Sequence, residues 1–194
     1  QSDYTVKYSG TTEIDRTYYF YDSTLRARAS DATVNKGLYA AFTENGTNDV
    51  PSYASTDNTK YITWYFGNAG EEQVDYIAKY KSAGNQTEKT FYYYDNGVGA
   101  YTRAGTATVN NKLLATRTEY GTAEPINFAT LTANTKSITY YKNDAGEEQS
   151  DYTVKYAGTT EIDRTFYFYN VSGAATRAGA STVNKPMYIS HTLK

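Results

Sequence analysis

The sequence predicts an all-β protein made of three tandem copies of a small, hairpin-rich antiparallel unit. The segment at residues 1–21 recurs at 149–169 with two differences, and a looser copy with one extra residue occupies 73–94. Apolar and polar residues alternate along each copy, which is the two-residue period of a β-strand. Of the 194 residues, 23 are Tyr, and Tyr, Thr, Val and Phe all favour strands. Because no window keeps a helical apolar period, we expect little helix.

The second copy shows the elements of the unit in order. Turn signals separate its predicted strands: GNAGEE follows the first strand, Gly84-Asn85 the second and Asp95-Asn96-Gly97 the third. We refer to the five strands of a unit as types a to e. They are expected at 60–66, 74–80, 89–94, 100–110 and 113–120.

The other two copies follow the same order, except that the first has no type a strand. The third copy is expected to form strands at 137–142, 150–156, 164–169, 174–184 and 186–192, and the first at 3–8, 16–21, 25–35 and 38–43. The predicted repeats are therefore 1–45, 60–120 and 137–194, with linkers at 46–59 and 121–136. Ile126 and Phe128 in the second linker could begin a sixth strand. Because a unit of about 58 residues buries little apolar surface alone, we expect the copies to pack as one continuous sheet or sandwich, or as a solenoid-like array.

Composition excludes several classes of partner and chemistry. The formal net charge is −2, and no run of Lys or Arg exceeds one residue, which argues against a nucleic-acid partner. No stretch approaches the roughly 20 apolar residues of a membrane span. The chain has no Cys, which excludes disulfides, thiolate catalysis and Cys-ligated metals.

The candidate catalytic groups fit surface positions better than an active site. His191 is the single histidine, and its counterparts in the other copies are Phe42 and Arg117, so we interpret it as a solvated strand position and not the base of a triad. The carboxylates recur with the unit, as surface positions do, whereas a glycosidase needs one specific pair. We therefore expect no enzyme. The recurring carboxylates are Asp3, Asp75 and Asp151, then Asp15, Glu88 and Asp163, then Glu71-Glu72 and Glu147-Glu148.

The turns that contain Ala-Gly-Glu-Glu leave one cofactor open. Asn143, Asp144 and Glu147 could offer oxygen ligands to Ca²⁺. No EF-hand-type acidic loop is present, and Asn68 stands where the third copy has Asp144. A plain hairpin turn is the preferred interpretation, and no other cofactor or metal is expected.

Recurrent Arg and Tyr residues have two readings, a ligand contact or packing. An Arg at one position of each type d strand could cover an aromatic ring, and exposed Tyr rows could stack on sugars or pair across strands. The residues concerned are Arg28, Arg103 and Arg177, with Tyr19, Tyr92 and Tyr167. Three sites match the N-glycosylation acceptor pattern, at Asn45, Asn85 and Asn170.

The aromatic hairpin with the sequence YYFYD resembles the repeats of microbial surface proteins. The likeness covers residues 91–103 and their copies, and is at the level of a class of repeat-built adhesins, stalks and extracellular fibres. It lacks the diagnostic Gly and Trp spacings of YD-type and cell-wall-binding repeats. The resemblance implies an extracellular or cell-surface location and carries over no binding residue.

These observations favour a structural subunit, or segment, of a surface fibre or stalk that associates with copies of itself. Without a type a strand in the first copy, its type b strand is expected to present an unpaired edge, and such an edge recruits strands from other chains. We expect Tyr4, Val6 and Tyr8 at one end of the junction and Tyr188 and Ile189 at the other, in a contact that propagates as a filament or closes as a ring. The alternative is an adhesion module that binds surface glycans through the Tyr rows.

Overall fold

The computed structural model describes residues 1–31, 35–46, 53–54, 57–82, 84–105 and 111–194. These residues form antiparallel strands, turns and one short 3-10 helix, so the predicted all-β class is confirmed. None of them belongs to a long apolar helix of the kind that crosses a bilayer. The chain divides into two compact units, Gln1–Lys89 and Thr90–Lys194. From here on, the first and second unit are these two parts of the chain, and the three sequence repeats are called copies or repeats. The border between these units falls inside one strand, and the boundaries of the three repeats stay a prediction.

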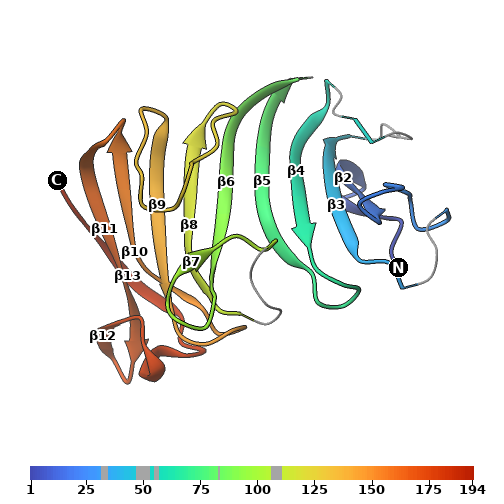
Figure 1. The fold of residues 1–194 in the computed structure, drawn as a ribbon. Helices are drawn as coiled ribbons and strands as arrows, with labels where there is room; N and C mark the ends of the chain where they lie inside the picture. The colour runs from blue at the N-terminus through green and yellow to red at the C-terminus, as the bar shows by residue number, and fades with distance from the viewer. Residues whose placement is uncertain (32–34, 47–52, 55–56, 83, 106–110) are drawn as a thin grey trace. The chain divides into compact units, whose positions relative to one another are not determined.

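The first unit is an antiparallel sheet in which each strand pairs with the next one along the chain (Figure 1). Its first hairpin turns at Gly10, whose φ of 61° lies in the left-handed region that glycine adopts at little cost. The strands correspond to types b, c, e, a and b. In order across the sheet they are β1 (Tyr4–Ser9), β2 (Thr12–Tyr21), β3 (Leu38–Asn45), β4 (Thr59–Phe66) and β5 (Gln73–Ser82).

The second unit continues the same succession of strand types. Strand β6 (Asn85–Asp95) begins in the first unit and ends in the second. Figure 1 shows the longer strands side by side in chain order: β8 (Leu113–Tyr120), β9 (Thr135–Lys142), β10 (Gln149–Ala157) and β11 (Thr160–Val171). Short β7 (Tyr101–Thr102) pairs with β6, whereas β12 (Ala174–Arg177) and β13 (Met187–Leu193) both pair with β11.

The type d strands are shorter than predicted, because β7 covers only residues 101–102 of the predicted 100–110 and β12 only residues 174–177 of the predicted 174–184. At 25–31 the chain forms turns and a single bridge between Tyr21 and Ala27, with Arg26 at a φ of 51°. In the third copy β12 gives way to a 3-10 helix at Ala180–Thr182. The arginines of the first and third segments, Arg28 and Arg177, reach across the sheet face to the carboxylates of Asp3 and Asp151. Parts of the predicted strands at 25–35 and 100–110 lie outside the described residues.

Two further expectations need correction. Each unit has its strands in one sheet, so the sandwich alternative does not describe the units. The segment around Ile126 and Phe128 forms bends and no sixth strand. It is a loop because Phe128 points onto the sheet, where its ring stacks on that of Tyr101 with centroids 3.8 Å apart.

Equivalent strands pair in the same register. Tyr4 lies opposite Tyr18, and Tyr152 lies opposite Phe166, and both hairpins shift register at the same Lys-Tyr step. Paired threonines mark the contact of type c with type e strands: Thr17 with Thr43, Thr90 with Thr118 and Thr165 with Thr192, at 2.9, 2.9 and 2.7 Å between hydroxyl oxygens. These pairs align residue 42 with 117 and 191, and residue 44 with 119 and 193.

The core of the first unit lies on one face of its sheet. Its buried members are Tyr18, Phe20, Ala40, Phe42 and Ile62. Tyr53, from the segment between β3 and β4, covers this cluster with its ring 5.4 Å from Phe20 and 5.0 Å from Phe42. Its hydroxyl accepts a hydrogen bond from Trp64 Nε1 at 2.9 Å. The predicted linker therefore supplies an aromatic cover for the sheet.

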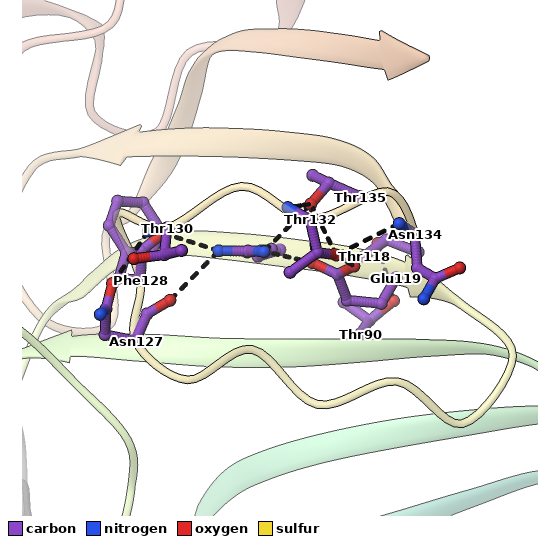
Figure 2. A network of polar contacts seen from close by, with 10 residues as sticks. Thr90, Thr118, Glu119, Asn127, Phe128, Thr130, Thr132, Asn134 and Thr135 are labelled. Carbon is purple, nitrogen blue, oxygen red and sulfur yellow. Dashed lines mark hydrogen bonds and ion pairs between the residues drawn. The ribbon is translucent and has the colours of Figure 1, made fainter. Parts of the chain in front are cut away.

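The second unit holds a fully buried ion pair, which sequence patterning did not predict. Arg117 and Glu119 project from β8 to the same face, and the guanidinium donates its Nε–H to Glu119 Oε1. Arg117 also donates to the backbone carbonyls of Asn127 and Phe128, at 3.2 and 2.9 Å. Figure 2 shows these loop residues on one side of the network, with Glu119 and Thr135 on the other. The network ties the loop after β8 to the strand.

Glu119 receives two more hydrogen bonds, from Thr132 Oγ1 at 3.0 Å and Thr135 Oγ1 at 3.1 Å. The first unit has the same arrangement without an arginine, because Thr59 Oγ1 donates to the buried Glu44 Oε1 at 2.6 Å. In both units a glutamate of a type e strand therefore holds the first threonine of the following type a strand.

Tyr53 should contribute to an alkaline unfolding transition. Burial raises the pKa of Tyr53 to about 12, above the value of about 10 in an unfolded chain. Its contribution to folding is complete below pH 10 and is lost as the pH rises through 12. Tyr53→Phe should therefore lose stability less steeply than the parent chain over this interval, as measured by urea unfolding at each pH.

At neutral pH, Tyr53→Phe keeps the ring and removes the hydroxyl that accepts from Trp64, which should cost about 1 kcal/mol. Tyr53→Ala also removes the covering ring and should cost about 2–4 kcal/mol. Equal losses for the two variants would show that the ring does not cover the core.

Removing one member of the buried ion pair should be more damaging than removing both. Glu119→Leu leaves the Arg117 charge buried without its carboxylate, which typically costs about 3–5 kcal/mol. The double variant Arg117→Met with Glu119→Leu leaves no buried charge and should recover part of that loss. The free energy of unfolding in urea measures both. A double variant whose loss of unfolding free energy equals the sum of the losses of Glu119→Leu and Arg117→Met, each measured alone, would contradict this account.

Candidate functional site

The strongest candidate for a functional site is the open edge of β1. This strand pairs with β2 on one side, and no other described strand pairs with it. Its side chains are the most exposed of the type b strands, with Tyr4 at 49% and Tyr8 at 59%. Val6 is partly buried, because its side chain lies on the face of Arg16. Tyr4, Val6 and Tyr8 lie on this strand, which has a single partner among the described strands.

An internal control exists for this edge, because residues 1–8 and 149–156 have the same sequence, QSDYTVKY. In the second occurrence, β10 pairs with β11 on one side and β9 on the other. Val154 is then 2% exposed, and the carboxylate of Asp151 is 6% exposed against 42% for Asp3. Burial also raises the pKa of Tyr152. The extra burial arises from the type a strand.

The second candidate edge is β13, a type e strand that pairs with β11 alone among the described strands. All of its residues are exposed, including Tyr188 at 57% and Ile189 at 53%. The position of the buried Glu44 is occupied here by Leu193, as the pairing with β11 shows. Strand β13 therefore lacks the carboxylate that receives a type a strand in the other two repeats. His191 lies opposite Phe166 on this exposed strand.

The recurrent arginines pack on aromatic rings, which is the structural reading of their role. Arg28 forms a bidentate ion pair with Asp3, with both N–O distances 2.7 Å, and its guanidinium carbon lies 4.6 Å from the Tyr18 ring centroid. Arg177 repeats this arrangement with Asp151 at 2.7 Å and with Phe166 at 4.5 Å. The third member, Arg103, lies 4.5 Å over the Phe91 ring. Each guanidinium is stabilised by cation–π attraction.

The predicted Tyr row lies on the opposite face from these arginines and is partly buried. Tyr19 shares a hydrogen bond with Thr5 at 3.1 Å, and Tyr167 shares one with Thr153 at 3.1 Å. Tyr92 occupies the matching place in β6 and is also partly buried. The hydroxyl groups of Tyr19 and Tyr167 thus hydrogen-bond to the neighbouring type b strand, which favours cross-strand pairing as the role of this row.

The turns considered for calcium use their carboxylates to join elements of the fold. Glu148 accepts the backbone N–H of Leu113 at the start of β8, at 2.9 Å, and that of Gly146 in its own turn, at 2.9 Å. Glu72 does the same with Leu38 and Gly70 at 2.9 and 3.0 Å. No group of three or more potential metal-ligating residues occurs in the part of the chain that the structure describes.

The three glycan acceptor positions differ in their surroundings. Asn45 and Asn85 are exposed, at the end of β3 and the start of β6. Asn170 is partly buried, and its Oδ1 accepts the Gly173 N–H at 2.8 Å within the hairpin turn. That hydrogen bond would be lost if Asn170 were turned outward to carry a glycan.

Four residues of these sites escaped sequence reasoning: the buried Glu44 and Glu119, and the covering rings of Tyr53 and Phe128. A signal for the glutamates was present, because each occurs one residue after a Thr at the end of a type e strand. The covering rings lie in linkers that share little sequence, so their equivalence becomes visible only when the loops are folded onto the sheet.

Comparison with known proteins identifies no relative: no family model, no curated protein and no solved structure matches this chain.

Proposed function

We propose that this protein is a non-enzymatic structural module of an extracellular fibre or stalk at the cell surface, and that it associates end to end through β-strand edges. The observation that carries the proposal is the open edge of β1, which has the sequence of an internal strand but the exposure of an outer one. An exposed strand edge offers unpaired N–H and C=O groups to another chain. Copies of the chain are its proposed partners, with no nucleic acid and no cofactor.

The way in which adjacent elements are joined also supports a structural role. Where a type e strand meets the next type a strand, a buried glutamate binds a threonine hydroxyl. Where the hairpin between types a and b meets the start of a type e strand, Glu72 or Glu148 bridges the two backbones. These contacts recur from unit to unit, as expected for repeats that bury their surfaces against neighbours.

Glycan binding by the Tyr row is the second proposal, and its support is weaker. The rings of Tyr19 and Tyr167 offer stacking surface, but their hydroxyl groups bond to threonines of the adjacent strand. A lectin would bind sugars as a monomer, whereas a fibre module polymerises without any ligand. The intrinsic fluorescence of the chain on addition of glycans separates these outcomes.

Charges placed on the β1 edge should suppress association. The double variant Tyr4→Lys with Tyr8→Lys adds two positive charges to strongly exposed positions of this strand, and like charges brought together at a junction oppose pairing. We expect the parent chain to sediment as larger species with rising concentration and to form polymers visible by negative-stain microscopy. The double variant should remain monomeric at the same concentrations.

Val98→Lys is the matched control, because Val98 is 83% exposed in a hairpin turn outside the edge strands. This variant should polymerise as the parent does. Deleting residues 1–8 should also abolish polymers while the second unit stays folded. A parent chain that stays monomeric at all concentrations would contradict the proposed function.

A further inference from the structure

We propose that one face of the second unit binds an uncharged, β-1,4-linked polysaccharide chain, which lies across the strands and stacks its sugar rings on tyrosines of alternate strands. This inference rests on the second proposed function, glycan binding, and names the class of ligand. The tyrosines concerned are Tyr92 of β6, Tyr141 of β9 and Tyr167 of β11.

The first argument is the spacing of this row, which has a member on every second strand. In the order of the sheet, β8 lies between β6 and β9, and β10 lies between β9 and β11 (Figure 1). Because neighbouring strands lie about 4.7–4.9 Å apart, alternate strands are about 9.5 Å apart. The first unit has the same pattern, with Tyr19 on β2 and Tyr65 on β4, on either side of β3.

The row lies on the face opposite the recurrent arginines. The Phe166 ring lies under Arg177, so Tyr167, the next residue, points to the other face. Tyr141 does the same, because the preceding Tyr140 belongs to the aromatic stack of the arginine face. The arginines therefore do not cover the rings of the row.

Hydrogen bonds to neighbouring strands hold these rings in place. Tyr167 shares one with Thr153 of β10 at 3.1 Å, and Tyr141 shares a longer one with Thr116 of β8 at 3.5 Å. Each phenol thus leans over a neighbouring strand, and each ring is only partly buried. A ring that is already oriented loses little conformational freedom when a ligand stacks on it.

The strands between the tyrosines carry small side chains beside the rings. In the second unit Ser150 of β10 lies opposite Tyr141, and in the first unit Ala41 of β3 lies opposite Tyr19. Side chains of this size do not block a long ligand that runs from one ring to the next.

A row of threonines runs beside the tyrosines on the same face. They lie directly opposite one another in successive strands, in the order Thr116, Thr139, Thr153, Thr165 and Thr192. Some of them pair, as Thr139 does with Thr153 at 2.8 Å. A hydroxyl group has one donor and two acceptor sites, so paired threonines can still bond to a ligand. The chemistry of this strip therefore suits a ligand that is uncharged and rich in hydroxyl groups.

A β-1,4-linked chain of neutral sugars meets these requirements. Successive rings of the extended chain are rotated by about half a turn, so the same ring face recurs once per disaccharide, at a distance close to that between alternate strands. The C–H groups of that face stack on aromatic rings, and the hydroxyl groups at the edge of the chain face the threonines. An α-1,4-linked chain coils and does not present one ring face at this repeat.

Isothermal titration calorimetry of the full-length chain with cellohexaose, the β-1,4-linked hexamer of glucose, tests the inference. At concentrations where the chain is monomeric, we expect saturable binding that changes little between low and high salt, because the strip carries no charge. Maltohexaose, the α-1,4-linked hexamer of the same sugar, is the matched control and should bind at least about tenfold more weakly.

Substitutions separate a ligand contact from a purely structural role. Tyr167→Ala removes a stacking ring and should weaken cellohexaose binding about tenfold. Tyr167→Phe loses the hydrogen bond with Thr153 but keeps the ring, and should bind within about twofold of the parent chain. Tyr4→Ala is the control, because it removes an exposed ring from the opposite face, where Arg16 lies over it. This control should leave binding unchanged.

Absence of cellohexaose binding, equal binding of maltohexaose, or unchanged binding by Tyr167→Ala would overturn the inference. The comparison of the two saccharides needs no variant, so it decides the inference even if Tyr167→Ala does not fold. Binding of maltohexaose alone would overturn the choice of ligand and leave glycan binding standing. Polymers that form although no saccharide binds would leave the fibre proposal standing, whereas cellohexaose binding by a chain that never polymerises would overturn that proposal alone.

Discussion

Lateral burial by neighbouring strands is the constraint on which this structure depends. In each unit the strands lie in one sheet, so a strand is covered mainly by the strands beside it and by loops folded onto one face. The octapeptide QSDYTVKY shows how much this matters, since its valine is 2% exposed between two strands and only partly buried with one. Stability is then approximately a sum of strand-to-strand contacts, as in other repeat architectures.

The junctions between elements combine constant and variable chemistry. Paired threonines link type c to type e strands throughout, and the Asp-Arg-aromatic contact appears in the first and third copies with the same geometry. In contrast, residues 42, 117 and 191 are Phe, Arg and His at one equivalent position. Arg117 is compatible with burial because Glu119 and two loop carbonyls satisfy its donors, whereas a buried charge without such partners would be costly.

The same features connect the fold with the proposed function. Strand-to-strand contacts that recur along the chain allow another strand to be added at an edge without changing the interior, because the incoming strand repeats an existing contact. Strand β1 carries a complete set of such contact groups, including a tyrosine ring already positioned by Arg16. Strand β13 has lost the glutamate, and its side chains are exposed along its length. The two edges of the described chain therefore differ in chemistry.

The sequence alone determined the all-β class and the positions of the type a, b, c and e strands. These follow from local information, namely the two-residue period and near-identical copies. The type d strands were predicted too long because their small and polar residues alternate, whereas in the first copy Arg28 forms an ion pair with Asp3, 25 residues away, that the pattern does not reveal. Only the tertiary structure decided that Tyr53 and Phe128 cover the sheet and that Glu119 is buried beside Arg117. These contacts join groups that are distant in the sequence. An alternating apolar pattern indicates on which face of the sheet a side chain lies, but it does not indicate which distant residue that side chain contacts.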